Sequence, residues 1–131
     1  MPELDPHAIP PVAGTLARFF RSGNGPTHAD LSTVFLETGF HEADPGSEVT
    51  KQQRVQQVVA SAGERPSEAR NLMEALLSEM RASRCFDPDS YGFSEAAVAA
   101  AQRAFAQAGW ELTDDGEPRF ATTGSVAAVA G

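Results

Sequence analysis

Residues 27–40 read THADLSTVFLETGF, a stretch that encodes one short helix together with both of its ends. Thr27 precedes Asp30 by three positions, the spacing of a capping box in which each side chain accepts a hydrogen bond from the other residue's backbone amide. Gly39 supplies the left-handed conformation that stops a helix, and Phe40 can then fold back over the last turn. One face of the segment is apolar and contains Leu31, Val34 and Phe35. The stretch therefore predicts an amphipathic helix that packs against a core.

Three further helices are predicted toward the C-terminus. The helix over 50–62 begins with a second capping box and ends at Gly63. The helix over 67–84 carries the widest apolar stripe, formed by Ala69, Leu72, Met73, Leu76, Leu77 and Met80. The last helix is capped by Ser94 and repeats the glycine stop at Gly109.

Toward the N-terminus the helical pattern is shorter. Residues 14–22, GTLARFFRS, place three apolar side chains on one helical face: Leu16, Phe19 and Phe20. Residues 1–12 contain four prolines, and we expect them to form an extended, flexible lead-in. The single helical domain is expected to cover 13–121, because 122–131 has no anchoring pattern and is interpreted as a linker or a truncated tail.

Residues 110–120, WELTDDGEPRF, change to a period of two, which is typical of strands. A three-residue loop over 114–116 pairs Trp110 with Phe120 and keeps the apolar side chains on one face, whereas a two-residue turn would mix the faces. The sequence thus predicts a mainly α fold, a compact bundle of about five helices with a small C-terminal β-hairpin.

Composition and charge limit the class of function. The chain has 131 residues, enough for one domain, and 41% of them are hydrophobic, as in globular proteins. The net charge of −8 argues against nucleic acid, whose binding depends on neutralised phosphates. No apolar run reaches the ~20 residues of a membrane span, and the acidic, proline-rich start is unlike a signal peptide. The single cysteine, Cys85, permits no internal disulfide, so we expect a cytoplasmic protein. The lack of a long apolar run leads us to expect no membrane contact.

The glycine-rich stretch over 22–31, SGNGPTHADL, is the first candidate site. It lacks the lysine of a Walker loop and the preceding strand of a dinucleotide-binding turn, so it is interpreted as the start of a capped helix. Arg21 and His28 have the loose Arg-x4–6-His spacing of HEPN ribonucleases, but glycines and a proline break the helix which that chemistry needs. Cys85 is interpreted as a buried thiol rather than a nucleophile. No histidine has the spacing of a metal ligand, and no cofactor is expected.

A basic, glutamine-rich helix start offers a second candidate site, formed by Lys51, Gln52, Arg54 and Gln56. A helix-turn-helix domain presents such a start to the major groove, with helix 27–38 as support and the hairpin as a wing. The connecting turn is longer than such a motif has, and the wing carries acidic residues where cations would be needed. A nucleic-acid-binding domain of this type remains an alternative.

The chain also resembles the N-terminal modules of bacterial abortive-infection and related antiviral proteins, of the AbiJ N-terminal type. The resemblance rests on a Phe-Phe pair, a Gly-x-Gly-Pro-Thr-His segment and a Lys-x-x-Arg-Val helix start: Phe19, Phe20, Gly23, Gly25, Pro26, Thr27, His28, Lys51, Arg54 and Val55. The segments LLSEMRASRCF and GWELTDDGEPRF extend it over roughly residues 15–120. The resemblance implies a small helical adaptor or sensor without catalytic residues of its own, which typically precedes an effector such as a HEPN or TIR-like domain.

We therefore expect a non-catalytic adaptor in a bacterial antiviral system. Its partner is expected to be a protein, an effector domain or a second copy of the chain, and its interface is expected to include Lys51, Gln52, Arg54 and Gln56. The alternatives are the helix-turn-helix-like nucleic-acid binder and a HEPN-like ribonuclease that uses Arg21 and His28.

Overall fold

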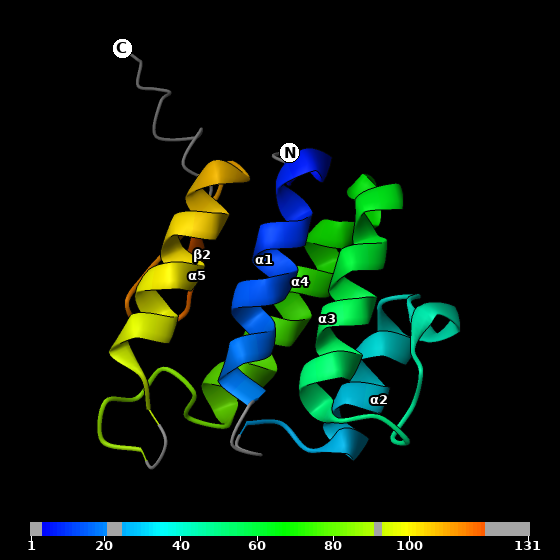
Figure 1. Ribbon diagram of the computed structural model, residues 1–131, viewed down its shortest axis with the longest axis horizontal. Helices are drawn as coiled ribbons and strands as arrows, with labels where there is room; N and C mark the ends of the chain where they lie inside the picture. Colours follow the sequence, from blue (N-terminus) through cyan, green and yellow to red (C-terminus); the bar gives the residue numbers. More distant parts are fainter. Residues whose placement is uncertain (1–3, 21–24, 91–92, 120–131) are drawn as a thin grey trace.

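The computed structural model describes residues 4–20, 25–90 and 93–119. Five α-helices and one small antiparallel hairpin make up the described chain (Figure 1), which confirms the predicted mainly α class. With η marking a 3-10 helix, the elements are η1 (Pro6–Ala8), α1 (Ile9–Ala17), η2 (Arg18–Phe20), α2 (His28–Glu37), η3 (His41–Ala43), α3 (Lys51–Ser61), η4 (Ala62–Glu64), α4 (Pro66–Ala82), α5 (Glu95–Gln107), β1 (Glu111–Leu112) and β2 (Pro118–Arg119).

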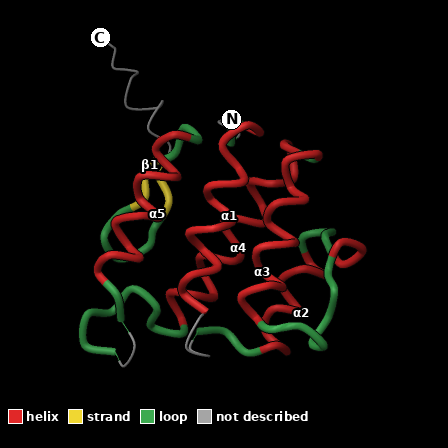
Figure 2. Tube along the Cα trace, in the orientation of Figure 1, coloured by secondary structure: helices red, strands yellow, loops and turns green. Residues whose placement is uncertain are grey.

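Helix α1 occupies the middle of the bundle. It packs against α3 on one side and against α5 on the other, and α4 lies behind these three helices (Figure 2). Helix α2 contacts α4 beyond α3, and the hairpin packs against α5. Helices α2 and α3 thus lie on one side of α1, and α5 with the hairpin lies on the other.

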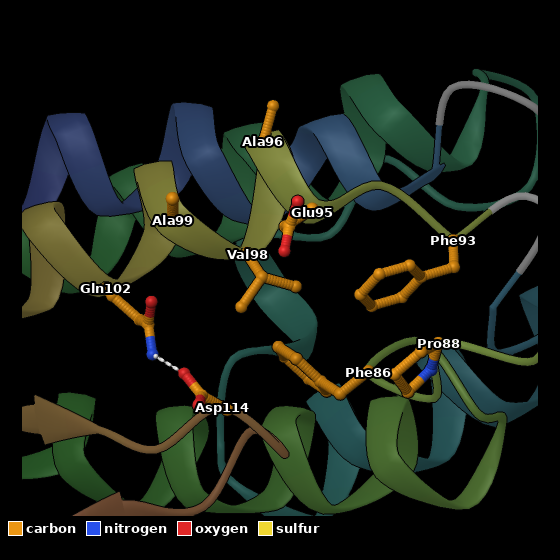
Figure 3. Close-up of a pocket in the computed structure, with 9 residues that line it drawn as sticks. All are labelled: Phe86, Pro88, Phe93, Glu95, Ala96, Val98, Ala99, Gln102 and Asp114. Carbon is orange, nitrogen blue, oxygen red and sulfur yellow. Dashed lines mark hydrogen bonds between the residues drawn. The ribbon is translucent and has the colours of Figure 1, made fainter.

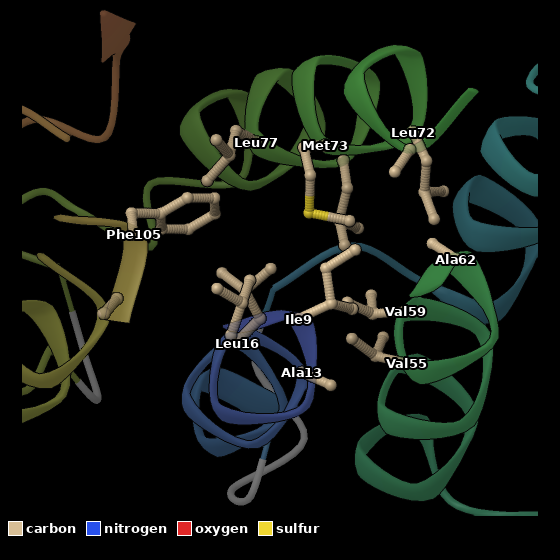
Figure 4. Close-up of a cluster of buried hydrophobic side chains, with 14 of the residues drawn as sticks. Ile9, Ala13, Leu16, Val55, Val59, Ala62, Leu72, Met73, Leu77 and Phe105 are labelled. Carbon is tan, nitrogen blue, oxygen red and sulfur yellow. The ribbon is translucent and has the colours of Figure 1, made fainter. Parts of the chain in front are cut away.

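One apolar core joins the helices (Figure 4). Its central side chains come from α1, α3, α4 and α5 and are fully buried: Ile9, Leu16, Val55, Val59, Met73, Leu77 and Phe105. Burying an aliphatic or aromatic side chain of this size stabilises a fold by about 1.5–3 kcal/mol each, so this cluster supplies the main driving force for folding.

The N-terminal segment is not the extended lead-in that its prolines suggested. Leu4 is only 1% exposed and α1 begins at Ile9, so the prediction of a flexible segment over 1–12 is wrong for residues 4–12. Pro10 and Pro11 stand in the first turn of α1, where the backbone amide that proline lacks has no partner within the helix. The domain therefore begins at least nine residues before the predicted boundary at 13, while the predicted tail over 122–131 lies outside the described residues.

The helix ends follow the predicted signals at most positions. In the first capping box, the Asp30 amide donates to Thr27 Oγ1 at 3.1 Å and the Thr27 amide donates to the Asp30 carboxylate at 3.0 Å. Gly39 adopts φ +83°, and the Phe40 amide donates to the carbonyl of Phe35 at 2.8 Å, as a glycine stop requires.

The exception is the end of α3. The chain tightens after Ser61 into the 3-10 helix η4, so it passes through Gly63 and leaves the helical conformation only at Arg65.

The hairpin has the predicted register. Glu111 pairs with Arg119 and Leu112 with Pro118. The Thr113 amide also donates to the Glu117 carbonyl at 3.0 Å, which leaves three residues, 114–116, in the loop. Continuation of this register would pair Trp110 with residue 120, but Phe120 lies outside the described residues.

Candidate functional site

The predicted interface lies at the start of α3, and the structure turns part of it inward. Arg54 is 1% exposed, Lys51 and Gln52 are half-buried, and Gln56 is exposed. Arg54, one of the residues expected at the interface, is therefore turned into the fold and not toward a partner. Arg54 precedes the buried Val58 by one helical turn, so both side chains lie on the same face of α3.

The Arg54 guanidinium is held by an internal network. Nε and Nη2 donate to the two carboxylate oxygens of Asp44 at 2.7 Å each, which is the paired geometry that binds carboxylates most strongly. Nη1 donates to the carbonyl and to Nδ1 of His28 at 2.9 and 3.0 Å, and Nη2 also donates to Ser32 Oγ at 2.7 Å. The hydrogen bonds from Arg54 hold the pKa of Asp44 below its usual value. This network ties α2, the loop after η3 and α3 together, because a buried charge must be paired.

Lys51, the other cation of the predicted interface, also faces the protein. Its Nζ donates to the carbonyl of Pro26 at 3.0 Å and lies 6.0 Å from the centre of the Phe20 ring. The helix-turn-helix interpretation depended on Lys51 and Arg54 as the cations that contact DNA. Both are directed into the fold, and the hairpin loop that would serve as the wing exposes Asp114 and Asp115.

The residues considered for catalysis are not assembled into a site by the described chain. Arg21 lies outside the described residues, so its pairing with His28 stays a prediction. His28 is half-buried, and its Nδ1 must accept the hydrogen bond from Arg54, since a guanidinium can only donate. Burial raises the pKa of the Cys85 thiol to about 11, which keeps it protonated at neutral pH. This agrees with the interpretation of Cys85 as a core thiol.

An open groove of about 680 Å³ lies between α5 and the chain that follows α4 (Figure 3). We call it the α5 groove, and its lining consists of Phe86, Pro88, Phe93, Glu95, Ala96, Val98, Ala99, Gln102 and Asp114. Most of these side chains are apolar, with the Phe86 and Phe93 rings facing the first turns of α5. Gln102 Nε2 donates to Asp114 Oδ1 at 2.9 Å and joins α5 to the hairpin loop at one end of the groove.

Local contacts hold both walls of the α5 groove. On one side, Ser94 Oγ accepts from the amide of Ala97 at 3.1 Å and fixes the start of α5. On the other, Gly116 adopts φ +85°, and a Cβ at this position would collide with the ring of Phe86. Arg81 Nη1 donates to the Gly116 carbonyl at 2.8 Å, which clamps the hairpin loop to the end of α4. Hydrogen bonds and close packing therefore fix the start of α5 and the hairpin loop, the two elements that flank the groove.

No motif in the predicted loop FDPDSYGF, residues 86–93, indicates the α5 groove. A partial signal was present, because Phe86 and Phe93 flank that loop and α5 is rich in alanine. That both rings and Asp114 line one groove depends on tertiary packing, which no local pattern encodes.

Several classes of site find no support among the described residues. Within residues 4–20, 25–90 and 93–119, no three side chains of the His, Cys, Asp and Glu types gather closely enough to hold a metal ion. In the same ranges no helix has the length and apolar character needed to cross a membrane. The chain matches no protein-family model, no curated protein and no solved structure with which it was compared.

Proposed function

We propose that this chain is a non-catalytic helical adaptor or sensor module that binds a protein partner through the α5 groove. The system we propose for it is a cytoplasmic antiviral system of the abortive-infection type in bacteria, as the resemblance to AbiJ N-terminal modules implies. The partner is an effector protein or effector domain.

The observation that carries the proposal is the contrast between the two sides of the bundle. On the side of α2 and α3, Arg54 and Lys51 are committed to internal contacts, so they are not available to a partner or a substrate. On the side of α5, an apolar floor lies open between a capped helix and a clamped hairpin. An open apolar groove with few polar groups on a supported scaffold is suited to binding a side chain or helix of another protein.

Photo-crosslinking in the native host tests this proposal. p-Benzoylphenylalanine replaces Ala96, which is exposed and lines the α5 groove, or Ala60, which is exposed on α3 among the glutamines of the originally predicted interface. We expect a discrete crosslinked protein from position 96 and none from position 60.

Crosslinks from position 60 alone would move the interface to α3, and the absence of crosslinks from both would refute the binding role of the groove. Crosslinked partners are identified by mass spectrometry. Competition with the unlabelled chain provides the control for specific capture.

A further inference from the structure

The charged side chains that line the α5 groove are both carboxylates. Glu95 stands in the first turn of α5, and Asp114 stands in the hairpin loop. Among the residues that the structure describes, neither carboxylate forms an ion pair. Arg103, the cation of α5, is exposed but does not line the groove. The groove thus combines an apolar floor with two carboxylates that form no ion pair with the described chain.

The distance between the two carboxylates sets the spacing of the cations that a bound segment would need. Glu95 and Gln102 are seven positions apart on α5, which is two turns and about 10 Å at the rise of an α-helix. Asp114 is hydrogen-bonded to Gln102, so its carboxylate lies at the far end of this interval. Val98 and Ala99 lie between the two ends, and the Phe86 ring faces them.

The shape of the wall favours a helix as the occupant. Ala96 and Ala99 both line the groove, and each contributes only a methyl group. Small residues at the contact allow two helix axes to approach at the short end of the usual 8–10 Å range. A helix also carries side chains seven positions apart on one face, which matches the interval between the carboxylates.

We propose that the α5 groove binds an amphipathic helix of the partner that carries two Arg or Lys residues seven positions apart, with aliphatic side chains between them. The aliphatic side chains occupy the floor formed by Val98 and the Phe86 ring, and the two cations meet Glu95 and Asp114. The net charge of −8 on the chain adds a long-range attraction for such a basic helix. This inference rests on the proposed interaction function and adds the chemistry of the partner to it.

A defined peptide tests the inference without knowledge of the natural partner. The probe is a fluorescein-labelled helical peptide of alanine and glutamine with two arginines seven positions apart and leucines three and four positions after the first arginine. A matched peptide has glutamates in place of both arginines. Binding to the full chain is measured by fluorescence anisotropy at about 0.05 and 0.5 M salt, because salt screens attraction between exposed charges. Amide shifts in a ¹⁵N NMR spectrum locate the bound peptide.

We expect the arginine peptide to shift amides between 95 and 102 and to bind more weakly at high salt. Glu95→Gln and Asp114→Asn should each weaken it about two- to fivefold, the usual effect of one exposed ion pair. Glu37→Gln removes an exposed carboxylate from α2, on the other side of the bundle, and should leave binding unchanged. All variants keep the size of the original side chain, so their folding is checked by the same NMR spectrum.

Three results would overturn the inference: equal binding of the glutamate peptide, equal effects of all three amide variants, or no binding of the arginine peptide. The outcome is separable from that of the crosslinking experiment. A crosslink from position 96 together with failure of the arginine peptide would refute the basic helix and leave the interaction function in place. Failure of both experiments would refute the two proposals together.

Discussion

Arg54→Ala is the most direct test of how the α2–α3 side of this fold is held. The substitution removes a guanidinium that is 1% exposed and that donates to Asp44, His28 and Ser32. Breaking a buried ion pair by removing one partner costs about 3–5 kcal/mol, because the other charge is left uncompensated. The Asp44 side chain is 11% exposed, so water can partly solvate its carboxylate when the guanidinium is removed. We therefore expect the free energy of unfolding to fall by about 3 kcal/mol, near the lower end of that range.

Urea unfolding followed by helical circular dichroism at neutral pH measures this loss. Arg54→Lys is the matched control, because it keeps the charge but replaces a planar fork of donors with a single ammonium. An ammonium cannot bind both carboxylate oxygens and also reach His28 and Ser32, so we expect an intermediate loss of about 1–2 kcal/mol. If the free energy of unfolding of Arg54→Ala lies within about 0.5 kcal/mol of that of the original chain, the network does not stabilise the fold and the reasoning is refuted.

Acid gives an independent check on the same contact. The hydrogen bonds from Arg54 lower the pKa of Asp44 below its usual value of 3.8, so the carboxylate is more easily ionised in the folded state than in the unfolded chain. The resulting stabilisation is complete above the pKa of the unfolded chain and is lost as the pH falls through the lower pKa of the folded protein. The difference in stability between the original chain and Asp44→Asn should thus be constant above about pH 5 and shrink below about pH 4. A difference that stays the same at low pH would contradict this assignment.

Three further outcomes can be measured on the purified chain. Gly116→Ala should lower the free energy of unfolding by about 2–4 kcal/mol, because it adds left-handed backbone strain and a collision with the Phe86 ring. Gly46→Ala adds only the backbone strain, so it should lower the free energy of unfolding by about 1–2 kcal/mol in the same urea titration. Burial raises the pKa of the Cys85 thiol to about 11, so the thiol should react with a thiol reagent at pH 8 about a hundredfold more slowly in the folded than in the urea-unfolded chain. Equal rates in the two states would contradict its burial. The purified domain should not cleave RNA, and a cleavage activity lost in both Arg21→Ala and His28→Ala would contradict the non-catalytic role.

The parts of the fold that could be predicted from sequence are those whose causes are local. A capping box or a glycine stop involves residues three to five positions apart, and the Thr27–Asp30 box and the Gly39 stop were both confirmed. The hairpin register followed from alternation of apolar side chains across a short loop, which is also local. The start of α1 was mistaken because prolines are compatible both with an extended segment and with a first helical turn. Only the burial of Leu4 and Ile9 against the rest of the chain distinguishes the two.

The candidate site was harder to predict because it depends on contacts between distant segments. The basic helix start predicts that Arg54 is exposed, although its position one turn before Val58 places it on the apolar face of α3. Its carboxylate partner, Asp44, lies ten positions earlier in a loop of no regular pattern, so the ion pair could not be inferred from spacing. The α5 groove combines residues from the chain after α4, from α5 and from the hairpin, and its shape follows from their packing.

The two sides of the bundle are separate enough for their substitutions to be interpreted independently. The partners of Arg54 belong to α2 and to the loop before α3, whereas Gly116 contacts Phe86 and Arg81 beside α5, and α1 lies between the two groups. Substitutions at distant sites without shared partners usually add within about 0.3–0.5 kcal/mol. The losses of Arg54→Ala and Gly116→Ala, each measured in a urea titration of the single variant, should therefore sum within that margin to the loss measured for the double variant. A larger deviation would mean that α1 or α4, which contacts α2 and also holds Gly116 through Arg81, transmits strain between the sides. A change of binding at the α5 groove could then no longer be assigned to the groove residues alone.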